Sequence, residues 1–295
     1  MEQAVQNWHA PVTHARRNFR DSPKDCPYIF ERYGLGVSVP RCLTIATSDS
    51  GGGAGIQADL KAFAAAGCHG SSAIVALTAQ NTVEVSGVYE IPPDFIRAQL
   101  DAVFSDIGVD AAKTGMLFSG PIIETVAAFL EKHPVPLVVD PVMVASSGAK
   151  LLQDDAVETL VGRLFPLATV ITPNRLEAEA LTVGSGLSLT LLTERLHDLG
   201  APAVIVTGGH GPDHVDHLFD GQQHVDIPVE RHDVAATHGA GCTHSATLTA
   251  ELARGLSLED AARHAAEAAS LAVVQGLIEI GAGEGPVDVL GIAAR

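Results

Sequence analysis

Short apolar runs alternate with longer stretches of helical spacing along most of the chain. The apolar runs are rich in β-branched residues, predict strands, and occupy residues 43–46, 137–139, 169–171 and 203–206. The helical stretches occupy residues 119–132, 154–163, 174–182, 188–199, 242–254 and 257–279. This alternation predicts an α/β fold, in which helices cover both faces of a mostly parallel central sheet.

Three segments do not follow this alternation of strands and helices. Residues 82–90 and 214–230 predict hairpins. We interpret the histidines around the second hairpin as surface residues: His210, His214, His217, His224 and His232. Residues 1–40 are polar, rich in proline and without a sustained period, which predicts a flexible N-terminal extension. Residues 41–295 are then expected to form one domain.

Composition and charge argue against some of the ligands and locations that a protein of this length could have. The chain has 295 residues, 46% hydrophobic content and a net charge of −17, so a large core is possible and nucleic acid is an unfavourable partner. No stretch approaches the roughly 18 consecutive apolar residues of a membrane span. The cysteines are scattered without a C-x-x-C pair, which favours the reducing cytoplasm over a disulfide framework.

A glycine-rich segment follows the first predicted strand. Residues 48–55 read Ser-Asp-Ser-Gly-Gly-Gly-Ala-Gly, which matches neither a P-loop nor a Rossmann fingerprint. Such a segment is either a flexible turn or a place where the backbone approaches a ligand closely. Asp59, in the helix that follows, either complements the helix dipole or directs its carboxylate into a pocket.

A second small-residue segment, residues 238–243, opens the helix predicted at 242–254. Successive amides at a helix N-terminus can bind an anion. Cys242 would lie near the N-cap, where the pKa of a thiol is lowered, so a thiolate is expected. A simple buried cysteine is the alternative; a zinc site lacks further ligands at suitable spacing.

Oxygen ligands follow two neighbouring strands. Asp140 comes directly after one, where α/β folds place catalytic carboxylates. Asn174 and Glu177 follow the next and share one helical face. Asn174 and Glu177 could bind Mg²⁺ through water, or they could form a capping box that starts the helix.

Together these segments resemble one family. Residues 44–61, which contain Gly-Gly-Ala-Gly-Ile-Gln-Ala-Asp-Leu-Lys, are similar to the opening of the hydroxymethylpyrimidine/phosphomethylpyrimidine kinases. That family's further motifs follow in its order: Ala-Leu-Thr-Ala-Gln-Asn-Thr at 76–82, Lys-Thr-Gly-Met-Leu at 113–117, Asp-Pro-Val-Met at 140–143, Thr-Pro-Asn at 172–174 and Thr-His-Gly-Ala-Gly-Cys-Thr at 237–243. The match covers about residues 42–290.

The resemblance implies a ribokinase-like fold for residues 41–295 and a cytoplasmic, homodimeric enzyme. Such an enzyme uses ATP and Mg²⁺ to phosphorylate 4-amino-5-hydroxymethyl-2-methylpyrimidine and then its monophosphate, in thiamine biosynthesis. The residues implied for the pyrimidine are Gly53, Asp59, Gln80, Met116 and Val142. Those implied for Mg²⁺–ATP are Asp140, Asn174, Glu177, Thr207, Gly209 and Thr237. Gly239, Ala240, Gly241 and Cys242 would form the anion hole, with Cys242 as the general base.

Three positions depart from the family pattern. Thr207 stands where a lysine is expected, Ala236 where an asparagine is expected, and Ala240 where a threonine is common. Thr207 and the Gly-Ala-Gly-Cys segment are also similar to pyridoxal kinases, so a pyridoxine/pyridoxal kinase is the second interpretation. A catalytically inactive pyrimidine-binding protein is the third.

Overall fold

The computed structural model describes residues 38–143, 154–208, 214–230 and 232–293. Val39 to Arg295 belong to one structural unit. The predicted N-terminal extension lies outside the described residues except for 38–40, and it stays a prediction. Gly209 and His210 also lie outside them.

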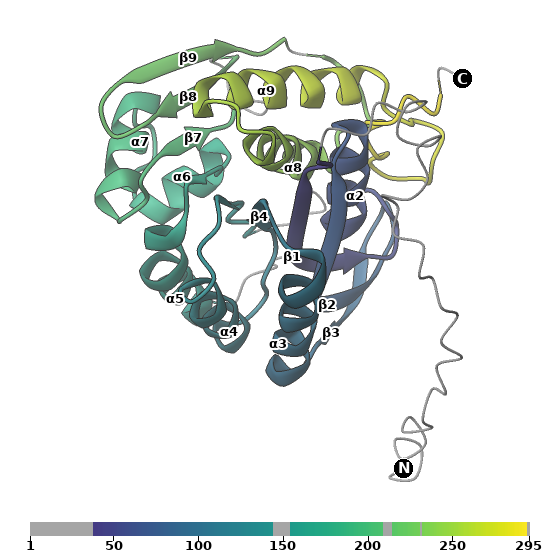
Figure 1. Ribbon diagram of the computed structural model, residues 1–295. Helices are drawn as coiled ribbons and strands as arrows, with labels where there is room; N and C mark the ends of the chain where they lie inside the picture. Colours follow the sequence, from purple (N-terminus) through teal and green to yellow (C-terminus); the bar gives the residue numbers. More distant parts are fainter. Residues whose placement is uncertain (1–37, 144–153, 209–213, 231, 294–295) are drawn as a thin grey trace, which may run out of the picture. The chain divides into compact units, whose positions relative to one another are not determined.

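The described strands form a single sheet of nine strands, in the order β3-β2-β1-β4-β5-β6-β7-β8-β9 (Figure 1). The pairings from β2 through β1, β4, β5 and β6 to β7 are parallel, whereas β3, β8 and β9 pair antiparallel at the two edges. The strands are β1 Arg41–Asp49, β2 His69–Gln80, β3 Val85–Glu90, β4 Ala111–Thr114, β5 Leu137–Val139, β6 Val170–Ile171, β7 Val204–Val206, β8 Val215–Phe219 and β9 His224–Pro228. The predicted mostly parallel sheet is confirmed.

Helices cover both faces of this sheet. One layer contains α2 (Gly55–Ala65), α8 (Ala240–Ala253) and α9 (Leu258–Val274). The opposite layer contains α3 (Pro93–Ala102), α4 (Gly120–Leu130), α5 (Asp154–Thr159), α6 (Arg175–Thr182) and α7 (Leu189–Asp198). Short π and 3₁₀ segments extend α3 and α5, at Val103–Ile107, Leu160–Leu164 and Phe165–Leu167.

The core is built mainly from aliphatic side chains and alanine. All three residues of Leu137–Val139 are buried, because a central parallel strand has helices on both faces. Between α2 and α8, Phe63 packs against Ala246 and Ala250, small residues that let α8 lie close to α2 and to β1 and β4. This packing fixes the first turn of α8 over the sheet. In the described part of the chain, no helix is long and apolar enough to cross a bilayer.

Most of the predicted elements are confirmed, and two corrections concern the hairpins. The 214–230 hairpin is β8 and β9, but His217 in it is buried, with its Nδ1 2.5 Å from Asp226 Oδ1. The other hairpin is longer than predicted, because β3 pairs with the whole second half of β2. The hydrophobic pattern did not predict β2, β4 or α3, since β2 begins with His69, Gly70 and Ser71, and Lys113 interrupts β4.

Candidate active site

A cavity of about 460 Å³ opens at the carboxyl ends of the parallel strands. The first residues beyond β4, β5, β6 and β7 line it, as does the end of β1. This is the position at which open α/β sheets bind ligands. Its lining includes most of the predicted site residues: Asp59, Gln80, Met116, Asp140, Val142, Asn174, Glu177, Thr207, Thr237, Gly239, Ala240, Gly241 and Cys242. Parallel strands have thus brought distant motifs to one edge.

Hydrogen bonds to the Asp49 carboxylate hold the glycine-rich loop in place. The Asp49 carboxylate accepts the N–H groups of Gly51, Gly53 and Ala54 at 2.7, 3.0 and 2.8 Å. His238 Nε2 lies 3.1 Å from Asp49 Oδ2. Although burial opposes ionisation, the His238 and amide contacts hold the pKa of Asp49 below its ordinary value. These contacts favour a loop of defined conformation over the flexible-turn alternative.

Gly53 and Gly239 have no side chain, which allows the backbone of this loop to contact the backbone at the start of α8. A Cβ at Gly239 would lie 1.9 Å from the carbonyl oxygen of Gly53, and the φ of Gly239 is +88°. A Cβ at Gly53 would lie 2.3 Å from the His238 ring. Gly53, which was predicted to contact the pyrimidine, therefore packs against His238 and Gly239 and is not among the described residues that line the cavity.

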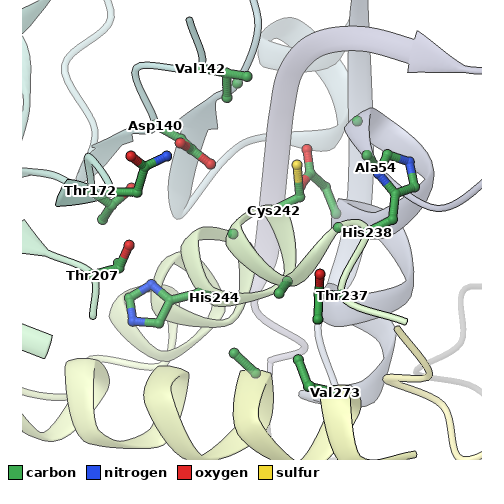
Figure 2. A pocket seen from close by; sticks show the side chains of 18 of the residues that line it. Ala54, Asp140, Val142, Thr172, Thr207, Thr237, His238, Cys242, His244 and Val273 are labelled. Atoms are coloured by element: carbon green, nitrogen blue, oxygen red, sulfur yellow. The ribbon is translucent and has the colours of Figure 1, made fainter. Parts of the chain in front are cut away.

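The helix α8 begins at Ala240 with Gly239 as its N-cap, so Cys242 is the third helical residue and not the N-cap. The Ala240 N–H donates to Thr237 O at 3.1 Å. The amides of Gly241 and Cys242 find no acceptor among the described residues. Orphan amides at a helix N-terminus suit an anion. Figure 2 shows the Cys242 thiol directed towards the part of the cavity that holds Asp140 and Val142.

The expected low pKa of Cys242 is wrong for this cavity. Burial raises the pKa of the thiol to about 12, and the negative charges of Asp59 and Asp140 add to the rise. The positive charge of Lys113 and the Gly55 amide act in the opposite direction. Desolvation by the surrounding elements therefore raises the pKa of the thiol by more than the helix N-terminus lowers it. The thiol keeps its proton at neutral pH.

Asp59 forms a fully buried ion pair, so the helix-dipole alternative for it is wrong. Its Oδ1 lies 2.8 Å from Lys113 Nζ, and its Oδ2 accepts the Thr44 hydroxyl at 2.6 Å. Burial raises the pKa of Asp59, against the pull of Lys113 and Thr44. Burial would lower the pKa of Lys113, but Asp59, Cys242 and Asp140 raise it above its ordinary value. The predicted site residues did not include Lys113.

Asn174 and Glu177 confirm the capping-box interpretation, and their binding of Mg²⁺ stays a prediction. They form a capping box: Asn174 Oδ1 accepts the Glu177 N–H, and Glu177 Oε2 accepts the Asn174 N–H, each at 3.0 Å. Both residues also line the cavity. Burial and the negative charge of Asp140 raise the pKa of Glu177 to about 8, against the amides of Asn174 and Met143. Two buried carboxylates that repel each other would be stabilised by a cation.

The donor set fits a hydrated hard cation. Within the described ranges, no three His, Cys, Asp or Glu side chains are placed to hold a metal ion directly. Two carboxylates with most of the coordination left to water and phosphate are what Mg²⁺ commonly receives from proteins. The geometry therefore fits the expectation that Asp140 and Glu177 act through water.

Two residues that line the cavity, His244 and Asp216, were not among the predicted site residues. His244 Nε2 lies 3.0 Å from Asp216 Oδ2, and Asp216 Oδ1 accepts the Gly208 N–H at 2.8 Å. This pair joins α8 to β8 and to the backbone just beyond Thr207; Figure 2 shows His244 beside Thr207. The predicted residue Gln80 also lines the cavity: its Oε1 lies 3.2 Å from Thr78 Oγ1, and its Nε2 lies 3.5 Å from His238 Nε2.

The chain is similar to known kinases in sequence and in structure. It is 48% identical over 83% of its length to a thiamine biosynthesis bifunctional protein of Geobacter sulfurreducens, of which it spans 51%. It is 47% identical over 85% of its length to a hydroxymethylpyrimidine/phosphomethylpyrimidine kinase of Haemophilus influenzae, of which it spans 97%.

Two solved structures show the same fold. The Bacillus subtilis pyridoxal kinase, solved as an ADP complex, has a TM-score of 0.80 at 38% identity, over 88% of this chain and all of that one. A phosphomethylpyrimidine kinase from Clostridium difficile has a TM-score of 0.69 at 39% identity, over 78% of this chain and 97% of that one. The model of the phosphomethylpyrimidine kinase family matches residues 49–288. The chain belongs to the phosphomethylpyrimidine kinase family.

Proposed function

We propose that this protein is a Mg²⁺- and ATP-dependent kinase that phosphorylates hydroxymethylpyrimidine, and then the resulting monophosphate, in thiamine biosynthesis. The observation that carries the proposal is one cavity in which Cys242 and the orphan amides of α8 meet the carboxylates of Asp140 and Glu177. The Haemophilus influenzae relative carries this activity in its name, and the Geobacter sulfurreducens relative is named for thiamine biosynthesis.

The pyrimidine would occupy the end of the cavity formed by Gln80, Met116 and Val142. Apolar walls with a few polar groups suit a small heteroaromatic ring. Gln80 can offer its amide to the aminopyrimidine edge. Each Asp59 oxygen already accepts a hydrogen bond, one from Thr44 and one from Lys113. Asp59 would therefore act on the pyrimidine end mainly by holding these two side chains, and less by accepting a hydrogen bond from the substrate.

Residues of the cavity would then carry out the phosphoryl transfer. The substrate hydroxyl oxygen attacks the γ-phosphorus of ATP while its proton passes to the Cys242 thiolate, and ADP leaves with the electrons of the broken P–O bond. The amides of Gly241 and Cys242 are placed to stabilise the charge on the transferring group. Asp140 and Glu177 would hold a hydrated Mg²⁺, which neutralises phosphate charge when bound. Thr207 and Thr237 line the cavity and would face the nucleotide.

A pyridoxal kinase is the second candidate function. Supporting it are the high structural similarity to the Bacillus subtilis pyridoxal kinase and the threonine at position 207. Gln80 and the name of the Haemophilus influenzae relative, which is 47% identical, favour the pyrimidine.

We also infer a cytoplasmic homodimer. The scattered cysteines suit a reducing compartment. At the β3 edge of the sheet, Val88, Tyr89 and the nearby Phe95 of α3 are exposed, and a second copy could cover them.

The direct test is product analysis. The purified protein is incubated with hydroxymethylpyrimidine and Mg-ATP, and ADP and pyrimidine phosphates are separated by chromatography. We expect ADP together with the monophosphate, followed by the diphosphate. Saturable binding of the pyrimidine without ADP release would instead favour an inactive binding protein.

Gln80 offers a test of substrate recognition. Gln80→Met should raise the KM for hydroxymethylpyrimidine by about two- to tenfold, since a neutral buried hydrogen bond contributes about 0.5–1.5 kcal/mol. The KM for ATP should stay unchanged. Gln222→Met, at an exposed position outside the cavity, is the control. An equal loss with pyridoxal, or no loss at all, would exclude this role for Gln80.

A further inference from the structure

His244 is a buried histidine of α8 that lines the cavity. The residue is only 4% exposed, and neither ring nitrogen has an aligned hydrogen-bond partner among the described residues. Nε2 lies at ion-pair distance, 3.0 Å, from Asp216 Oδ2. Buried polar atoms in folded proteins normally have a partner. The unpartnered Nδ1 is therefore explained if a group from outside the chain binds it.

The surroundings place this ring beside position 207. Asp216 Oδ1 accepts the Gly208 N–H at 2.8 Å. A Cβ at Gly208 would lie 2.0 Å from Val215 O, so the backbone here packs directly against β8. Thr207, the preceding residue, lines the cavity and stands where a lysine is expected. Figure 2 shows that His244 lies at the position where that positive charge is missing.

The cavity offers little positive charge to a polyphosphate. Among the described residues that line it, Lys113 is the one lysine or arginine, and its Nζ lies 2.8 Å from the carboxylate of Asp59. Acidic side chains, among them Asp140 and Glu177, line the same space. Such a cavity repels phosphate groups unless cations and hydrogen-bond donors offset its charge.

Four of the described histidines line the cavity, and they differ in burial and partners. His238 Nε2 lies 3.1 Å from a carboxylate oxygen of the glycine-rich loop. His232 Nε2 lies 2.8 Å from a serine hydroxyl of α9. His214 is exposed. His244 is the member of this set that is both buried and without an aligned hydrogen-bond partner.

We propose that His244 binds the polyphosphate of ATP through Nδ1 and supplies the positive charge that a lysine at position 207 would otherwise supply. The proposal rests on the function proposed above and adds a nucleotide-binding residue to it. With a phosphate oxygen at Nδ1 and the Asp216 carboxylate beside Nε2, the ring carries a proton on each nitrogen. His244 transfers neither of these protons in the reaction.

The test measures the Kd of AMP-PCP, a non-hydrolysable ATP analogue, and of adenosine, which has no phosphate, by calorimetry. The reference is Asp216→Asn, in which the amide can accept the Gly208 N–H and donate to His244. Asp216→Asn/His244→Leu then removes the ring and leaves no buried carboxylate at position 216. Because a hydrogen bond to a charged group is lost, this double variant should bind AMP-PCP about ten- to a hundredfold more weakly than the reference. Its affinity for adenosine should be unchanged.

Two further variants separate charge from packing. Adding Thr207→Lys to the double variant should restore most of the affinity for AMP-PCP, since it returns a cation to the same end of the cavity. His69→Leu, at an exposed position outside the cavity, is the matched histidine control and should keep the parental Kd. In steady-state kinetics, the double variant should have a higher KM for ATP than Asp216→Asn, with the same KM for hydroxymethylpyrimidine.

Equal AMP-PCP affinities with histidine and leucine at position 244 would overturn the proposal. An equal loss of affinity for AMP-PCP and adenosine would also overturn it, because the ring would then serve the nucleoside or the packing. If the double variant does not fold, nuclear magnetic resonance of the parent labelled with ¹⁵N-histidine decides. AMP-PCP, but not adenosine, should shift the His244 ring nitrogens, identified with His244→Gln, and an unshifted ring would overturn the proposal.

The two proposals can fail separately. A parent protein that binds AMP-PCP but does not phosphorylate hydroxymethylpyrimidine would contradict the proposed function and still leave His244 tested. A parent that does not bind AMP-PCP would contradict both.

Discussion

Replacing Cys242 with alanine should lower kcat by about two to four orders of magnitude, the usual contribution of a positioned general base. The substrate hydroxyl must lose its proton as its oxygen attacks phosphorus, and the Cys242 thiol lines the same cavity as Asp140 (Figure 2). The KM for ATP should change little, because the orphan amides of α8 and the two carboxylates remain. Steady-state kinetics with hydroxymethylpyrimidine and Mg-ATP would measure both parameters.

Two variants control this experiment. Cys242→Asp should retain more activity than Cys242→Ala, because a carboxylate restores a proton acceptor. Cys68→Ala changes a buried cysteine in the core between α2 and α8, so it should leave kcat close to that of the parent. A folded Cys242→Ala protein with a near-parental kcat would exclude the general base and leave the amides as the main catalytic device.

The pH dependence follows from the environment of the thiol. Burial raises the pKa of Cys242 to about 12, so at neutral pH the active thiolate is the minor form. The fraction of thiolate increases as pH rises towards that value, so kcat/KM should rise across the neutral and alkaline range and fall in acid. The Cys242→Ala variant should lose this slope. A parental profile that stays flat between pH 7 and about pH 9 would contradict proton transfer to Cys242.

Asp140→Asn should lower activity by about 10- to 100-fold, the usual effect of losing a group that holds a metal through an outer-shell contact. Asparagine can still accept the Ser245 hydroxyl that Asp140 Oδ2 accepts at 2.8 Å, so the fold should be kept. The charge lost is one of the two that attract Mg²⁺, and higher Mg²⁺ concentrations should recover part of the rate. Activity is measured as a function of Mg²⁺ at saturating ATP.

Asp226→Asn is the matched control for this variant. Asp226 is an exposed carboxylate that contacts His217 outside the cavity, so its loss should leave the Mg²⁺ requirement unchanged. An Asp140→Asn protein with the parental Mg²⁺ dependence would show that Asp140 does not serve the metal.

The fold was predictable where one physical signal dominated. Apolar runs predicted β5, β6 and β7, since a parallel strand with helices on both faces is apolar throughout. The strand β4 was not predictable from its pattern, because Lys113 lies in the core only through its ion pair with Asp59. The helix α9 ends at Val274 and not at 279; Gly276 follows it, where a Cβ would lie 2.6 Å from that of Ala236.

The sequence predicted most of the residues that line the candidate site, but it did not predict the direction in which the pKa of Cys242 is shifted. Motifs at the ends of parallel strands must meet at one edge, which is why Asp140 and Glu177 line the same cavity. Cys242 reaches that cavity from the first turn of α8. The sequence predicted a low pKa for Cys242 from its helix position alone. The actual rise depends on burial against α2 and on Asp59 and Asp140, which only the tertiary structure brings there. The His244–Asp216 pair likewise joins residues from distant elements.

The central claim is that this cavity selects a hydroxymethylpyrimidine as its phosphoryl acceptor. The measurement that tests it most directly is the ratio of kcat/KM values for hydroxymethylpyrimidine and pyridoxal, taken side by side with the same Mg-ATP and the same protein. We predict a ratio well above one in favour of the pyrimidine. A ratio below one, with pyridoxal phosphorylated more efficiently, would contradict the claim and assign the protein to the second function.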